Sequence, residues 1–186
     1  MAALQSLERA MRAGYRAGTA EALPPLWEAL SAARVEVPIA RIIGPDLAAM
    51  ELDGAAGQLA FRMALLSDDY EAQAARATPQ APFDRLLVAI ARGLVSGAEA
   101  GAAGDDDRIR AVVDGFTAAG PPSRLAALVD GDRLGEAILR AITLLAEGTS
   151  GDLDQVTDAL ALLRSVGLED TARRTALEFL ILDRQG

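Results

Sequence analysis

The segment LGEAILRAITLL, residues 134–145, decides the fold class of this chain. Apolar side chains recur in it at intervals of three and four residues, at positions 134, 137, 138, 141, 142 and 145. On a helix of about 3.6 residues per turn these positions share one face. The segment therefore predicts an amphipathic α-helix whose apolar face packs against neighbouring helices.

The same spacing recurs along almost the whole chain. It is clearest in residues 83–94 and 109–116, and it is weaker in residues 4–15, 26–30, 59–63, 153–163 and 172–180. Only Arg34 to Val37 alternates with the period of a strand, and that stretch ends at Pro38. We therefore predict an all-α fold with about nine or ten short helices in antiparallel hairpins, arranged as an α-α superhelix or an irregular bundle.

Proline, glycine and aspartate mark where these helices begin and end. Proline is tolerated in the first helical turn, glycine favours the residue after a helix, and aspartate caps free N–H groups at a helix start. The prolines expected at helix starts are Pro24, Pro25, Pro38, Pro45, Pro82, Pro121 and Pro122. The glycines expected after helix ends are Gly44, Gly120, Gly148 and Gly167.

One stretch of low complexity interrupts the helical pattern. Residues 97–104 read GAEAGAAG and contain no large apolar side chain, which is typical of a flexible connection. The sequence therefore predicts an N-terminal helical half at 1–96, a Gly/Ala-rich connection at 97–104 and a C-terminal helical half at 105–186. We expect hydrophobic packing to join the halves into one domain.

Three local strings resemble the turns between helices of tetratricopeptide-type α-solenoids. They are Asp68-Asp69-Tyr70-Glu71-Ala72, the segment GDRLGEA at 131–137 and the segment GDLDQV at 151–156. The resemblance implies a solenoid of helical hairpins. The turns at 131 and 151 are 20 residues apart, which differs from that family's repeat of about 34 residues, so none of its ligand-binding residues is carried over.

The composition excludes several chemistries. The chain has no Cys, His, Lys or Asn, and its 18 basic residues are all Arg. It therefore has no side chain for thiolate or imidazole metal sites, for a Schiff base, or for a Ser-His-Asp triad. We expect no cofactor and no enzymatic activity.

The charge and the hydropathy pattern also restrict the partners. The formal net charge is −9, with acidic residues spread along the chain, which disfavours nucleic acid and anionic lipid as partners. No apolar run reaches the length of about 20 residues that a membrane span needs. The first twenty residues also lack the unbroken apolar region of a signal peptide, so we expect a cytoplasmic protein.

Two carboxylate clusters give an alternative function. Asp68, Asp69 and Glu71 lie together in sequence, as do Asp105, Asp106 and Asp107, and hard divalent cations require such clustered oxygens. Capping of helix starts explains the same residues without a ligand. A divalent-metal carboxylate enzyme stays the alternative to a binding protein.

Several apolar residues are candidates for a protein interface. The chain's single tryptophan is a candidate because tryptophan is common in binding hot spots, and the last helix has four consecutive large apolar residues that one helix stripe cannot hold. That helix is therefore either wedged between neighbours or packed partly on another chain. The candidate interface residues are Trp27, Leu4, Leu7, Met11, Tyr15, Phe179, Ile181 and Leu182.

The sequence thus predicts a non-catalytic helical interaction or assembly module. Its partner is expected to be another protein, a peptide or a second copy of the chain. Helical periodicity begins at residue 2 with no capping residue before it, so a helical domain excised from a larger protein is a further alternative.

Overall fold

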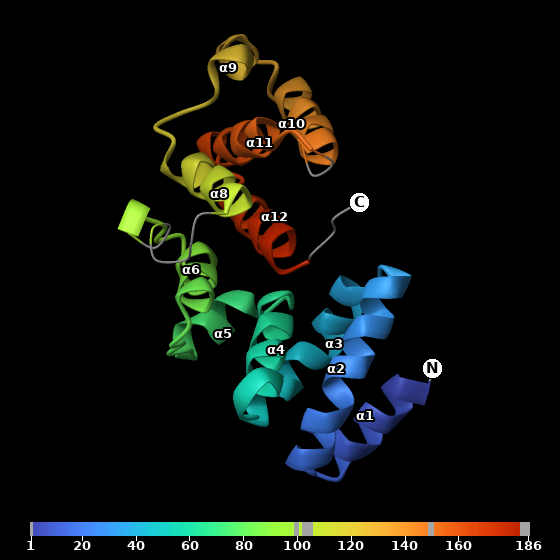
Figure 1. Ribbon diagram of the computed structural model, residues 1–186. Coiled ribbons are helices and arrows are strands. Elements are labelled where there is room, and N and C mark those ends of the chain that lie inside the picture. The colour runs from blue at the N-terminus through green and yellow to red at the C-terminus, as the bar shows by residue number, and fades with distance from the viewer. Residues whose placement is uncertain (1, 99–100, 102–105, 149–150, 183–186) are drawn as a thin grey trace. The chain divides into compact units, whose positions relative to one another are not determined.

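The computed structural model of the chain describes residues 2–98, 101, 106–148 and 151–182. These residues form eleven α-helices, and none of them belongs to a strand (Figure 1). The prediction of an all-α fold is confirmed. Every apolar-periodic segment of the sequence lies mainly within a helix, because the 3.6-residue pattern fixes the type of element even where it does not fix its ends.

The chain divides into two compact units, Met1–Ala77 and Thr78–Gly186. The N-terminal unit contains α1 (Ala2–Arg12), α2 (Arg16–Ala33), α3 (Glu36–Ala49), α4 (Gly54–Leu65) and α5 (Tyr70–Arg76). The C-terminal unit contains α6 (Pro82–Ala91), α8 (Asp107–Thr117), α9 (Ser123–Asp130), α10 (Leu134–Gly148), α11 (Leu153–Ser165) and α12 (Glu169–Ile181). Each unit has its own buried apolar residues.

In the N-terminal unit, α1 packs on α2 and α3 packs on α4. The contact between α3 and α4 is close because Gly44 lies in it: a Cβ atom at Gly44 would come within 2.8 Å of the Met63 carbonyl oxygen. Gly44 therefore lies inside α3 rather than after it, and the prediction that it ends a helix is wrong. Its small size is needed for the approach of the two backbones.

Three prolines were expected at helix starts but lie inside helices. Pro24 and Pro25 are in the middle of α2, and Pro45 is inside α3. Pro24 and Pro25 are exposed, so the carbonyl groups that lose a partner there can bond to water. Leu23, Leu26 and Leu30 are buried along one face of α2 on both sides of the proline pair. This continuous packing outweighs the cost of about 3 kcal/mol for a proline within a helix.

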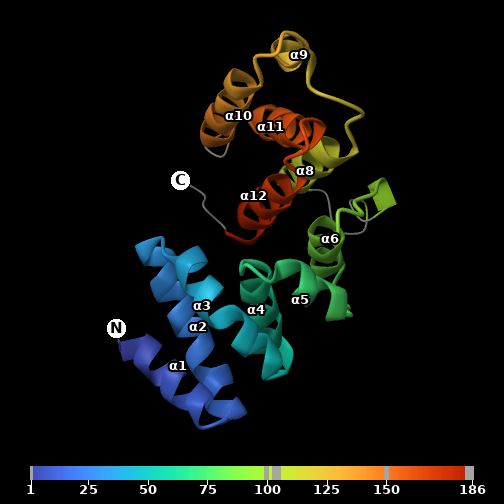
Figure 2. The ribbon, with the colours of Figure 1, turned by 180° about the vertical axis from the view of Figure 1, so that it is seen from behind.

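In the C-terminal unit, α11 is the central helix and contacts α8, α10 and α12 (Figure 2). It buries Val156 and the whole run from Ala159 to Leu163. The crossing with α8 is close at Gly115, where a Cβ atom would lie 2.8 Å from the Cβ of Leu160. A hydrogen bond of 3.0 Å from the Thr157 hydroxyl to the Ala111 carbonyl joins the same two helices.

The division between the units differs from the predicted halves. The boundary falls after Ala77, and α6 packs on α12 of the C-terminal unit instead of belonging to the N-terminal half. The composition shows that residues 97–104 lack large apolar side chains, but it does not reveal which helix covers the buried Leu86, Leu87 and Ile90 of α6. Most of the predicted connection, residues 99–100 and 102–104, lies outside the described residues.

Three arginines of the C-terminal unit bind carbonyl groups at the ends of other helices. Arg108 donates to the carbonyls of Phe179 and Leu182 at the end of α12, and its guanidinium lies 4.6 Å from the centre of the Phe179 ring. Arg164 donates to the carbonyls of Gly115 and Phe116 at the end of α8 and lies 5.1 Å from the Phe116 ring centre.

The third arginine, Arg173, donates to the Ala91 carbonyl at the end of α6 over 3.5 Å. The last carbonyls of a helix have no partner within it, and the helix dipole makes them attractive to cations. These arginines therefore stabilise helix ends and hold α8, α6 and α12 to their neighbours.

Candidate binding surfaces

The apolar side of α10 faces the solvent. Leu134, Leu139 and Ile142 are 44, 66 and 54% exposed, whereas the residues that α10 buries are Ala137, Ala141 and Gly148. The prediction that the stripe 134, 137, 138, 141, 142 and 145 packs inward is therefore wrong for Leu134 and Ile142. Ile138 and Leu145 are only half-buried.

Close packing on α11 explains why only small residues of α10 point inward. A Cβ atom at Gly148 would lie 2.9 Å from Cγ2 of Val156 and 3.0 Å from its backbone nitrogen, so the two helices nearly touch there. Val156, the residue of α11 that lies closest to Gly148, is fully buried. The residues that α10 buries are all small, and its larger apolar side chains are exposed or half-buried.

We call the outward-facing residues the α10 face. Its members share one side of the helix at spacings close to its turn, and they are Leu134, Ile138, Leu139, Ile142 and Leu145. No charged residue is among them. Contiguous exposed apolar residues are a known feature of interaction surfaces, which makes the α10 face a candidate binding surface.

The charged residues of α10 lie on its other side and bind one another. Arg140 pairs with Glu136 at 3.0 Å, and Arg133 pairs with the second oxygen of the same carboxylate. The hydrogen bond from Arg140, with that from Arg133, lowers the pKa of the Glu136 carboxyl below its ordinary value. Arg140 of α10 and Arg133, which directly precedes the helix, are therefore both paired with Glu136.

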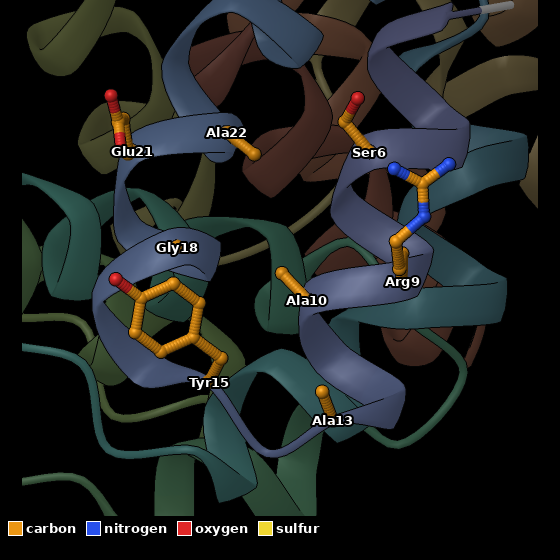
Figure 3. A pocket seen from close by; sticks show the side chains of 8 residues that line it. All are labelled: Ser6, Arg9, Ala10, Ala13, Tyr15, Gly18, Glu21 and Ala22. Carbon is orange, nitrogen blue, oxygen red and sulfur yellow. The ribbon is translucent and has the colours of Figure 1, made fainter.

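A shallow groove of about 440 Å³ lies between α1 and α2 (Figure 3). The lining surface is mainly apolar, and five of its eight residues are small. The eight are Ser6, Arg9, Ala10, Ala13, Tyr15, Gly18, Glu21 and Ala22. The ring of Tyr15 is 60% exposed and lies over Gly18, where a Cβ atom would come within 2.3 Å of the ring. Of the interface residues predicted on the first helix and the turn after it, only Tyr15 lines this groove.

A second groove, of about 430 Å³, lies between the starts of α8 and α11 and is polar. Asp107, Asp114, Asp152 and Asp154 line it. Asp106, which precedes the lining residue Asp107, caps α8 by accepting a hydrogen bond of 2.8 Å from the backbone N–H of Arg108. Asp152 of the lining caps α11 by accepting a hydrogen bond of 3.2 Å from the backbone N–H of Asp154. Capping is thus confirmed for Asp106, and Asp107 pairs with Arg110. Asp105 lies outside the described residues.

The other predicted carboxylate cluster is not gathered around one point. Asp68 pairs with Arg41 at 3.5 Å, and Asp69 precedes α5 without a side-chain capping bond. Among residues 2–98, 101, 106–148 and 151–182, no three carboxylates are placed so that they could hold a metal ion together. Within the same ranges no helix is long and apolar enough to cross a bilayer.

The predicted interface residues lie in both units and differ in exposure. Tyr15 is exposed, whereas Leu7 is fully buried and Leu182 is 5% exposed. Half-buried members of the predicted set are Leu4, Met11, Trp27, Phe179 and Ile181. Leu7 and Leu182 therefore contribute to the interior. The helix α12 contacts α6, α8 and α11, which accounts for its four consecutive apolar residues.

Leu139 and Ile142, the most exposed residues of the α10 face, are not among the interface residues predicted from the sequence. The signal was present in the segment 134–145, because Leu139 lies outside the stripe that was expected to face inward. A helix with large apolar residues on more than one side either lies in the interior or binds a partner.

Comparison of the chain with protein-family models, with curated proteins and with solved structures found no match.

Proposed function

We propose that this chain is a non-catalytic helical module that binds another protein. The α10 face carries the proposal, because Leu134, Leu139 and Ile142 remain 44–66% exposed while the same helix buries only small residues. Burial of a whole leucine or isoleucine side chain contributes about 1.5–3 kcal/mol, so covering these three exposed parts would contribute about 3 kcal/mol to binding.

The chemistry of the chain supports the same proposal. The sequence has no Cys, His or Lys, so proton transfer and nucleophilic attack would depend on carboxylates and hydroxyl groups. The aspartates of the α8–α11 groove are adjacent to capped helix starts, and Asp107 is paired with Arg110. A binding function requires none of this chemistry and uses the apolar face that the fold leaves open.

Affinity capture of the whole chain from the lysate of its native host, followed by mass spectrometry and quantification, tests the proposal. We expect one protein at a constant molar ratio to the bait in independent preparations. Recovery of a small metabolite or a divalent metal with no protein at constant ratio would contradict it.

A thermal melt with and without Mg²⁺, Mn²⁺ or Ca²⁺ tests the metal-enzyme alternative. A binding module is expected to keep the same melting temperature in each ion. A rise of several degrees that is abolished by Asp68→Ala or Asp107→Ala would overturn the proposal, since ligand binding to the folded state raises the melting temperature.

A further inference from the structure

We infer that the α10 face binds a basic amphipathic helix of another protein. This inference rests on the proposed function and adds the chemistry and shape of the partner. It depends on three observations: what the chain itself can place on the face, the size of the face, and the charge around it.

The residues outside the described ranges have no suitable side chains to cover the α10 face. They are residues 1, 99–100, 102–105, 149–150 and 183–186, and they include no leucine, isoleucine, valine, phenylalanine or tryptophan. Apolar burial is approximately proportional to the apolar area removed from water. These residues therefore cannot place a leucine, isoleucine, valine or aromatic side chain on the α10 face.

The size of the face fits one helix better than a second globular copy. From Leu134 to Leu145 the face extends over about three helical turns, or about 16 Å. A helix that docks by its apolar side uses anchors spaced over two to three turns, which matches this length. Stable association of two globular proteins usually requires about 20–30 residues from each side, far more than the five of the α10 face.

The charge around the face favours a cationic partner. Residues 78–186 carry 17 acidic side chains and 11 arginines, and the whole chain has a net charge of −9. Asp130 and Asp132 are exposed and precede α10, while Arg133 and Arg140 are both paired with Glu136. A second copy would bring the same negative charge to the contact, whereas lysine and arginine on the rim of a partner helix would attract it.

The direct test uses a fluorescent synthetic helical peptide with leucine at the a and d positions of the heptad and lysine elsewhere. Two control peptides have the same composition in scrambled order, and glutamate in place of lysine. Anisotropy titration of the whole chain is expected to show at least tenfold tighter binding of the lysine peptide than of either control. Higher salt is expected to weaken that binding, because part of the attraction is electrostatic.

The variants Ile142→Ser and Leu139→Ser locate the binding surface. Each is expected to weaken binding of the lysine peptide by tenfold or more. The matched control is Ile42→Ser, which replaces a 71% exposed isoleucine of α3 and is expected to leave binding unchanged. Circular dichroism melts check that all three variants fold, which their exposed positions favour.

Equal affinity of the chain and Ile142→Ser for the lysine peptide would overturn the inference, and so would equal binding of the scrambled or glutamate peptide. A dimer of the chain alone that Ile142→Ser dissociates, seen by sedimentation, would overturn it in favour of a second copy.

Repeating the lysate capture with Ile142→Ser as the bait separates the failure of this inference from the failure of the proposed function. If both baits retain the same protein, the site is wrong and the binding function stands; if neither bait retains one, the binding function itself fails.

Discussion

The neighbouring helices α10 and α11 have similar apolar periodicity, but they differ in how far their large apolar side chains are buried. The helix α11 contacts α8, α10 and α12 and buries Val156 and Ala159 to Leu163. By contrast, α10 buries two alanines and a glycine and leaves its leucines and isoleucines wholly or partly exposed. Apolar periodicity thus identifies a helix without determining which of its sides the rest of the chain covers.

The largest difference is expected when one leucine is removed from each helix. Leu160→Ala leaves a cavity at a fully buried position of α11 and should lower the free energy of unfolding by about 2–5 kcal/mol. Leu139→Ala on α10 removes the same atoms from a 66% exposed position and should change it by no more than about 0.5 kcal/mol.

Urea denaturation of both variants measures the difference directly. Similar losses for the two leucines would contradict the orientation of α10, since they would mean that Leu139 is packed within the fold.

The next largest difference is expected for an arginine of each helix. Arg164 of α11 donates to the carbonyls of Gly115 and Phe116 and pairs with Glu169 at 3.1 Å, with 26% of its side chain exposed. Arg164→Ala should lower the free energy of unfolding by about 1.5–3 kcal/mol, because it leaves the end of α8 without these bonds to a charged donor.

Arg140→Ala is the matched change on α10. It removes an ion pair with Glu136 from a side chain that is 60% exposed, and the expected loss is about 0.5 kcal/mol or less. Chemical denaturation of both variants at one ionic strength gives the comparison. A loss for Arg164→Ala no larger than that for Arg140→Ala would refute the role of Arg164 in holding the end of α8.

Two glycines of α10 allow the contact with α11 to be tested by changes of opposite sign. Gly148→Ala places a Cβ atom 2.9 Å from Val156 and should destabilise the fold by about 1–3 kcal/mol. Gly135→Ala meets no atom within 4 Å and should stabilise it by about 0.5 kcal/mol, since alanine favours the helix. Thermal melts of the two variants should therefore shift in opposite directions; shifts of the same sign would contradict the close contact at Gly148.

Apolar spacing predicted eight of the eleven helices that the described residues form, all except α3, α5 and α9, but it did not predict all of their packing. The spacing in residues 134–145 predicted α10, and the aspartates before α8 and α11 predicted capped helix starts. The path of α2 through Pro24 and Pro25 was missed, because only residues 26–30 were recognised as periodic and both prolines were expected at a helix start.

The candidate site was missed for a related reason. An apolar stripe is chemically the same whether it faces a neighbour in the chain or another molecule, and the small residues Ala137, Ala141 and Gly148 that select the inward side matter only because α11 lies so close. That proximity is a property of the tertiary structure. The partners of Arg108 and Arg164 were hidden for the same reason, because each bonds to residues more than forty positions away.

The smallest expected effect concerns the charged side of α10 and its dependence on pH. Hydrogen bonds from Arg140 and Arg133 lower the pKa of Glu136 below its ordinary value of 4.5 in the folded chain. A carboxyl whose pKa is lower in the folded state binds fewer protons there than when unfolded, so its stabilising contribution is complete above the ordinary value and is lost as the pH falls through the folded pKa. The stability of the chain relative to Glu136→Gln should therefore be greatest near neutral pH and decline in the acid range. NMR titration of the Glu136 side chain in the folded and in the denatured chain measures the shift. A pKa in the folded chain that is equal to or higher than the one in the denatured chain would mean that the two arginines do not bind Glu136 in solution, and the charged side of α10 would then be as open to a partner as its apolar side.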